Sequence, residues 1–106
     1  MFARIVSMRL KPNTHAEFTR TFDQEVIPTL RKQQGFRDEI LFATPNGTEV
    51  VGLSLWDSKE NADSYSRSTY PQVLKSLAKV VEGTPEIRPY DVTMSTCHKI
   101  NAAVAV

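Results

Sequence analysis

Residues 51–62 read VGLSLWDSKENA, and this stretch decides the fold. Its first half alternates hydrophobic residues with small or polar ones, which is the period-two pattern of a strand. The pattern ends at Trp56, the only tryptophan, and Asp57-Ser58 follows at once as a signal for a helix start. The sequence therefore places its one tryptophan where a strand passes into a helix.

The segment before Trp56 predicts a β-hairpin. Residues 36–44 and 49–56 have the pattern of strands, and Pro45-Asn46-Gly47 lies between them. Asn-Gly pairs tolerate the positive φ angles that tight turns need. Two further strands are predicted at residues 2–10 and 87–98, near the two ends of the chain.

Two helices are predicted to flank the hairpin. The first helix is predicted to start with a capping box formed by Thr14 and Glu17 and to end at Gly35. Pro28 is expected to bend its last turns. The apolar stripe of this helix consists of Phe18, Phe22, Val26 and Leu30. The second helix runs from Ser58 to a break at Gly83-Thr84-Pro85, with a kink or restart at Pro71.

The resulting order βαββαβ predicts an α+β fold, the ferredoxin-like plait. It has a four-stranded antiparallel sheet with two helices on one face. We expect the domain to span residues 1–100 and residues 101–106 to form a short tail that frays.

The two faces of the predicted sheet differ in polarity. One is strongly apolar and is expected to lie under the helices; it contains Phe2, Val6, Met8, Leu10, Phe36, Ile40, Phe42, Val51, Leu53, Leu55, Tyr90, Val92 and Met94. The other mixes Ile5, Leu41, Ala43 and Val50 with Ser7, Arg9, Glu39, Ser54, Asp91, Thr93, Ser95 and Cys97. The mixed face is too apolar to be left in water, so we expect a homodimer through this open sheet face, with Arg9, Glu39 and Asp91 in ion pairs between subunits.

Composition narrows the possible partners. The net charge of the 106 residues is +1 and the basic residues are scattered, so no nucleic-acid partner is expected. The longest apolar stretch is far too short to span a bilayer, so no membrane partner is expected either. The single Cys97 excludes an intrachain disulfide and a site built on paired thiolates, which favours a reducing compartment and hence a cytoplasmic location. Because no basic residue is expected beside Cys97 on its strand face, we expect an inert, half-buried thiol.

Four motifs resemble the antibiotic biosynthesis monooxygenase (ABM) domain family over residues 2–98. They are Glu25-Val26-Ile27-Pro28 with Gln34-Gly35-Phe36, Leu55-Trp56-Asp57-Ser58-Lys59-Glu60, Tyr70-Pro71-Gln72-Val73-Leu74 and Pro89-Tyr90-Asp91-Val92. The resemblance implies a dimeric α/β barrel. It also implies one of several activities, because the family includes cofactor-independent monooxygenases of aromatic compounds, haem-degrading oxygenases, relatives that handle aldehydes or quinols, and members without a known reaction.

Three positions distinguish this sequence from the haem-degrading branch of the family. At the positions where that branch has Asn, Trp and His, this sequence has Ser7, Tyr65 and Lys75. With His15 and His98 as the only histidines, haem ligation in that manner is not expected. No cofactor and no metal site are predicted.

Trp56, Tyr65, Tyr70 and Ser7 are the candidate ligand-binding residues of a cleft between sheet and helices. Trp56 is interpreted either as the wall of an aromatic pocket or as a plug that seals the core. Tyr65 and Tyr70 either present hydroxyl groups to a ligand or pack in the core with the hydroxyl reaching solvent. His98 and Tyr65 are the catalytic candidates. The alternative interpretation of His98, and also of His15, is that the side chain is exposed to solvent and has no functional role.

The leading hypothesis is therefore a homodimeric ABM-type monooxygenase that oxidises a small electron-rich aromatic or quinol-like compound without a cofactor. The alternative is a non-catalytic dimeric module of the same fold that binds small molecules or serves in a stress response. The volume of the cleft separates the two, because small-molecule sites approach about 300 Å³ whereas packed cores leave voids hardly larger than water.

Overall fold

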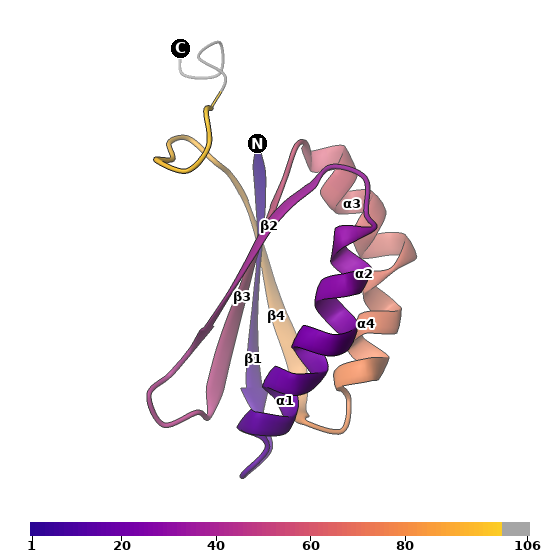
Figure 1. The fold of residues 1–106 in the computed structure, drawn as a ribbon, viewed down its shortest axis with the longest axis vertical. Coiled ribbons are helices and arrows are strands. Elements are labelled where there is room, and N and C mark those ends of the chain that lie inside the picture. The colour runs from indigo at the N-terminus through magenta and orange to yellow at the C-terminus, as the bar shows by residue number, and fades with distance from the viewer. Residues whose placement is uncertain (101–106) are drawn as a thin grey trace.

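A computed structural model describes residues 1–100, and it contains a four-stranded antiparallel sheet with all the helices on one side (Figure 1). The strands are β1 (Phe2–Leu10), β2 (Phe36–Ala43), β3 (Glu49–Trp56) and β4 (Val81–Asp91), in the spatial order β2-β3-β1-β4. The helices are α1 (His15–Thr21), η1 (Phe22–Val26), α2 (Ile27–Arg31), α3 (Lys59–Ser68) and α4 (Tyr70–Leu77). The predicted ferredoxin-like fold is confirmed, whereas the predicted fraying of residues 101–106 lies outside the described residues.

The first helical arm is divided into three segments. Its middle segment, η1, is a π-helix that ends two residues before Pro28. Residues four apart drift by about 40° around an α-helix, because 3.6 residues make one turn. The wider turn of η1 offsets this drift, so all four residues of the stripe, Phe18, Phe22, Val26 and Leu30, are buried.

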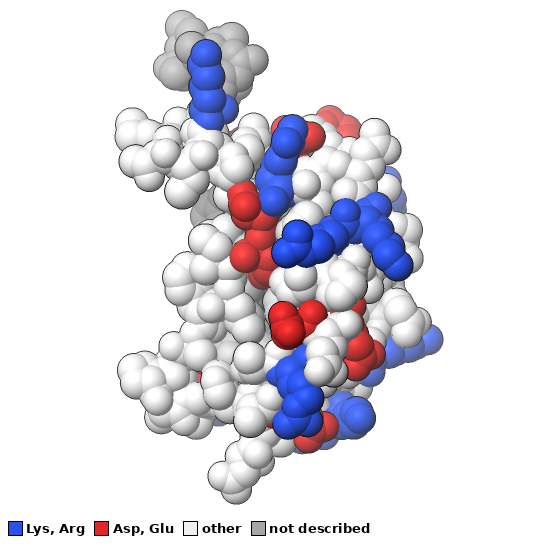
Figure 2. All heavy atoms as spheres, in the orientation of Figure 1, with Lys and Arg blue, Asp and Glu red and all other residues white. Residues whose placement is uncertain are grey.

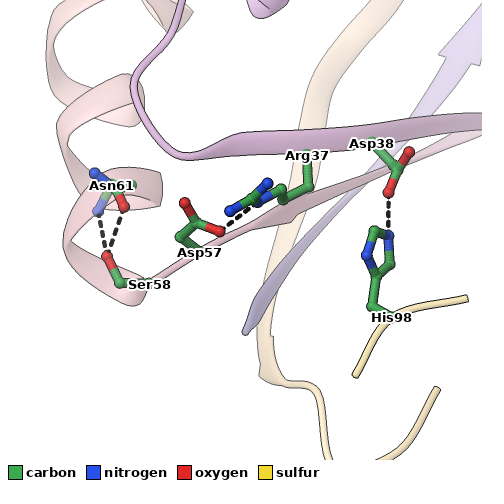
Figure 3. A network of polar contacts seen from close by, with 6 residues as sticks. All are labelled: Arg37, Asp38, Asp57, Ser58, Asn61 and His98. Carbon is green, nitrogen blue, oxygen red and sulfur yellow. Dashed lines mark hydrogen bonds and ion pairs between the residues drawn. The ribbon is translucent and has the colours of Figure 1, made fainter. Parts of the chain in front are cut away.

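The helix starts differ from the sequence prediction in one case. The prediction of a capping box at Thr14 is wrong. The Thr14 hydroxyl donates to the Lys11 carbonyl at 2.7 Å, and its side chain accepts no hydrogen bond from the first turn of α1. In contrast, Ser58 caps α3 by accepting from the Asn61 backbone N–H at 3.2 Å, and it donates to the Asn61 side chain (Figure 3). The predicted restart at Pro71 is confirmed, since α3 ends at Ser68 and α4 begins at Tyr70.

The last strand lies earlier in the chain than predicted. Gly83-Thr84-Pro85 was expected to end the second helix, but α4 ends at Leu77 and these residues belong to β4. The pairing of β4 with β1 shifts register between Ser7 and Arg9, and Gly83 has a φ of +73°. A bulge in an edge strand tolerates Gly and Pro, so this triplet does not break the strand.

The assignment of side chains to the two faces needs a larger correction. Directly paired residues of an antiparallel sheet share a face. The pairing places Ile40, Leu53 and Ile5 in one row, and Phe42, Val51 and Ser7 in the next, on the face without helices. Tyr90 joins this face opposite Ala3.

A bulge in β2 is one cause of this error. The register between β2 and β3 shifts between Phe36 and Asp38, so Phe36 faces the helices whereas Ile40 and Phe42 do not. In β3 the other parity, Val50, Ser54 and Trp56, is buried under the helices, although Val51, Leu53 and Leu55 look more apolar. The last two predicted members, Val92 and Met94, lie beyond β4, and Met94 is exposed.

Candidate functional site

A cavity lies between the helix-covered face of the sheet and the helices. Its volume is about 30 Å³, which is room for about one water molecule. Its apolar wall consists of Val6, Met8, Phe22, Val26, Leu30, Gly52, Val73, Leu74 and Leu77. Its polar wall consists of Arg4, Glu39, Ser54, Tyr65 and Tyr70. The site therefore joins an apolar slot to a cluster of polar groups.

Three polar residues form one row across the sheet. Ser54 of β3 pairs with Arg4 of β1 on one side and with Glu39 of β2 on the other, so all three face the helices. The Ser54 hydroxyl accepts from the Trp56 indole N–H at 2.9 Å and donates to the Arg4 carbonyl at 3.2 Å. Neighbouring strands lie about 4.8 Å apart, so the row spans about 10 Å.

Arg4 is the most unusual member of the row because it is 5% exposed. Its Nε donates to the Ser66 hydroxyl at 2.9 Å, and its guanidinium lies 4.0 Å from the centre of the Tyr70 ring. Within residues 1–100, Arg4 makes no ion pair, and its Nη2 has no hydrogen-bond partner. A buried, incompletely paired cation is costly, so this donor suits an oxygen of a bound molecule.

Tyr70 adds a second free donor beside Arg4. Its ring is 9% exposed, and its hydroxyl is buried without a partner among the described residues. Tyr65 lies at 6.1 Å from Tyr70 between ring centres, and its ring is also within 5.3 Å of the Arg4 guanidinium. Burial raises the pKa of both phenols, although the nearby Arg4 guanidinium lowers it in part, so both keep their protons at neutral pH and are able to donate hydrogen bonds.

Glu39 supplies a carboxyl group to the same wall. Burial raises its pKa to about 8, although the positive charge of Arg4 lowers it in part. The carboxyl lies over Gly52, where a Cβ would come within 3.0 Å of Oε2. Gly52 therefore leaves the space that the Glu39 side chain uses.

The structure separates the predicted site residues into two groups. Tyr65 and Tyr70 line the cavity. Trp56 is 0% exposed and lies outside the lining, packed against Phe36 and Tyr65 with ring centres at 5.5 Å and 5.0 Å. Ser7 is exposed on the opposite face of the sheet, so its predicted place in the cleft is wrong.

His98, the other catalytic candidate, also lies away from the cavity. Its ring pairs with the Asp38 carboxylate on β2, as Figure 3 shows, and it is not part of the lining. A second ion pair in the same view joins Arg37 to Asp57. This polar network fastens chain segments to the sheet at the surface.

Sequence reasoning missed Arg4 and Glu39. The signal for Arg4 was an arginine among the apolar residues of one strand parity, Phe2, Val6, Met8 and Leu10. The period-two pattern predicts Glu39 on the mixed face and in ion pairs between subunits. That assignment is wrong because the bulge before Asp38 turns Glu39 toward the helices.

Comparison with known families identifies the chain. The family model "Antibiotic biosynthesis monooxygenase" matches residues 1–83. The chain belongs to the ABM family. No curated protein has a significant sequence match to this ABM protein.

Solved structures give the same fold at low sequence identity. A monooxygenase from the gene ActVA-Orf6 of Streptomyces coelicolor, in complex with nanaomycin D, has a TM-score of 0.74 at 18% identity and covers 89% of this chain and 88% of its own. SnoaB, a cofactor-independent oxygenase from Streptomyces nogalater, has a TM-score of 0.75 at 13% identity, covering 92% and 97%. A conserved protein from Methanosarcina mazei Go1 has a TM-score of 0.69 at 22% identity, covering 85% and 91%.

Other features of the ABM protein bear on its partners. Across residues 1–100, none of the helices has the length and apolar character that crossing a membrane would require. In the same range, no group of three or more His, Cys, Asp or Glu side chains is arranged to hold a metal ion. On the face shown in Figure 2, Lys and Arg side chains are interspersed with Asp and Glu.

Proposed function

We propose that this ABM protein is a cofactor-independent monooxygenase that acts on a small electron-rich aromatic or quinol-like compound in the cavity between sheet and helices. The observation that carries the proposal is the pair of free donors, Arg4 Nη2 and the Tyr70 hydroxyl, at the polar wall of an otherwise apolar cavity. Membership in the ABM family and the names of two structural relatives, a monooxygenase and a cofactor-independent oxygenase, support it.

The chemistry needs no external reductant. A hydroquinone that has lost a hydroxyl proton donates electrons to O2 itself; one oxygen atom enters the ring and the other leaves as water, so hydroquinone and O2 give a hydroxyquinone and water. The protein must exclude water and stabilise the negative charge on the substrate oxygen. The apolar wall serves the first need, and Arg4 and Tyr70 serve the second.

Turnover requires the cavity to open, because about 30 Å³ does not admit an aromatic ring. The wall opposite the sheet includes Phe22 and Val26 of η1 and the partly buried Leu74 of α4. π-Helical segments are frequent at functional sites. We expect η1 and α4 to move apart when a ligand binds.

Oxygen consumption with naphthohydroquinones and anthrones tests the proposal. Under ¹⁸O2, the product should gain one labelled atom at a rate above spontaneous oxidation. Tyr70→Phe keeps the ring under Arg4 and removes only the free donor, so it should lower kcat/KM on the order of 10²-fold. Wild-type protein that leaves every such substrate at its spontaneous rate would refute the oxygenase.

The small cavity favours a second candidate, the non-catalytic dimeric module that binds small molecules or serves in a stress response. In that case the space is closed by the protein's own side chains, as packed cores are. The ¹⁸O2 experiment separates the two candidates. A non-catalytic module gives no labelled product, whether or not it binds the compound.

We also propose a homodimer formed through the face of the sheet that carries no helices. Ile40, Phe42 and Tyr90 on this face are 48%, 52% and 47% exposed. Light scattering after gel filtration should give twice the chain mass for wild type and the single chain mass for Phe42→Glu. Ile87→Glu is the control, since Ile87 is 44% exposed but pairs with Val6 on the other face; a monomeric wild type contradicts the dimer.

A further inference from the structure

Glu39 is partly buried and lines the cavity. It stands at one end of the row Glu39–Ser54–Arg4, and its carboxyl lies over Gly52, which also lines the cavity. Within residues 1–100, Glu39 is the only carboxylate of the lining, and it makes no ion pair there. A titratable group in this place is available to a bound molecule.

Hydrogen-bond donors that could hold a deprotonated oxygen lie at the other end of the row. Arg4 and Tyr70 are each at least nine-tenths buried, and each has a donor atom without a partner among the described residues. Two such donors beside an apolar slot fit an oxygen atom that carries negative charge and belongs to a flat ring. A phenol or an enol meets that description once it has lost its proton.

We propose that Glu39 accepts the hydroxyl proton of the ligand and that Arg4 and Tyr70 hold the oxygen left behind, so the site selects aromatic compounds with an acidic hydroxyl group. The ligand O–H bond breaks, an O–H bond forms on the Glu39 carboxylate, and the electron pair stays on the ligand oxygen. The role of Glu39 as the catalytic base rests on the proposed oxygenase function. Its role as a proton acceptor on ligand binding does not, and it can be tested without turnover.

The groups that face Glu39 set the pH range of this transfer. The positive charge comes from Arg4 on β1, and the titratable phenols are Tyr65 on α3 and Tyr70 on α4. The remaining lining residues of η1, α2 and α4 are apolar: Phe22, Val26, Leu30, Val73, Leu74 and Leu77. Burial thus raises the pKa of Glu39 to about 8, a range in which a general base is both available and strong enough.

Proton uptake on binding of 4-nitrophenol tests the assignment without any oxidation. At pH 9 the free ligand is a phenolate and Glu39 is ionised, so the proposal requires Glu39 to take up one proton on binding while the bound ligand keeps the visible absorbance of the phenolate. Calorimetric titrations in two buffers of different protonation enthalpy should give an uptake near one proton per bound ligand for wild type. Glu39→Gln should still bind the phenolate but take up none.

Two further variants separate a proton acceptor from a structural residue. Glu39→Asp keeps a carboxyl group and should retain the uptake, whereas Glu49→Gln changes an exposed glutamate of β3 and should match wild type. Equal uptake by wild type and Glu39→Gln overturns the proposal. Failure of 4-nitrophenol to bind the wild-type protein overturns the ligand class.

Steady-state rates keep this proposal distinct from the oxygenase itself. With an oxidisable quinol, kcat/KM should rise with pH and level off above about 8, and Glu39→Gln should lose that rise and fall by about 10²-fold to 10⁴-fold. Normal turnover by Glu39→Gln would leave the oxygenase standing and refute Glu39 as its base. Proton uptake without turnover would refute the oxygenase and leave the binding mode standing.

Discussion

The carboxyl of Glu39 should make the stability of the protein depend on pH, and replacing it with an amide should remove that dependence. The folded protein holds this proton up to a pKa of about 8, whereas an unperturbed glutamic acid releases it at 4.5. Between these values the folded state binds more protons than the unfolded state, so stability falls as pH rises. The loss is complete above about pH 8.

The size of the loss follows from the two pKa values. A rise from 4.5 to about 8, at about 1.4 kcal/mol per pKa unit, gives an upper limit of about 5 kcal/mol. Glu39 is only partly buried, and water near it weakens the effect, so we expect about 2–3 kcal/mol. At pH 9 the Glu39→Gln variant should be more stable than wild type by this amount, and the difference should vanish as the pH falls below 4.5.

Urea unfolding measures this difference directly. Trp56 is the only tryptophan and is 0% exposed, so its fluorescence reports the loss of the core. Both proteins are compared at one protein concentration, because the stability of a dimer depends on it. Glu60→Gln, an exposed change on α3, should follow wild type. Parallel stability curves for wild type and Glu39→Gln from pH 5 to pH 9 would show that the Glu39 carboxyl is not buried as described.

Two other substitutions and the addition of haemin have definite expected outcomes. Trp56→Ala should lower the free energy of unfolding by about 3–5 kcal/mol in urea followed by circular dichroism, and a loss below about 1 kcal/mol would rule out the plug. Gly52→Ala places a Cβ 3.0 Å from Glu39 Oε2, so kcat/KM for a quinol should fall about tenfold at nearly wild-type stability; an unchanged rate would show that the space over Gly52 does not position Glu39. Haemin should give no Soret band above a control protein, since His15 and His98 do not line the cavity; a bound spectrum would revive haem binding.

The order of elements was predictable because each one carries a local signal. The stripe from Phe18 to Leu30 has helical spacing, and Asn46-Gly47 marks the hairpin turn, where Gly47 has a φ of +72°. Pro71 likewise starts α4 within its first turn. These signals depend only on residues that are close in the sequence, so one amino-acid sequence is sufficient to predict the order of helices and strands.

The covered face of the sheet was not predictable in the same way. Period two divides β3 into two sets but does not say which set the helices cover, and here the covered set contains Gly52 and Ser54. A one-residue bulge in β2 then reverses the parity after Phe36. Helical spacing is sufficient to predict that Tyr65 and Tyr70 face the sheet. The face on which Glu39 lies is not predictable from period two, because the bulge reverses it.

The position of Trp56 joins the two interpretations that the sequence left open. Its ring is fully buried and packs between Phe36 and Tyr65, as a plug at the strand end would. Its indole N–H also donates to Ser54, the residue that stands between Arg4 and Glu39 in the polar row. With this bond and its own bond to the Arg4 carbonyl, the Ser54 hydroxyl is fixed in place. The tryptophan at the junction of strand and helix therefore closes the core on one side and, through Ser54, orders the polar wall of the cavity on the other.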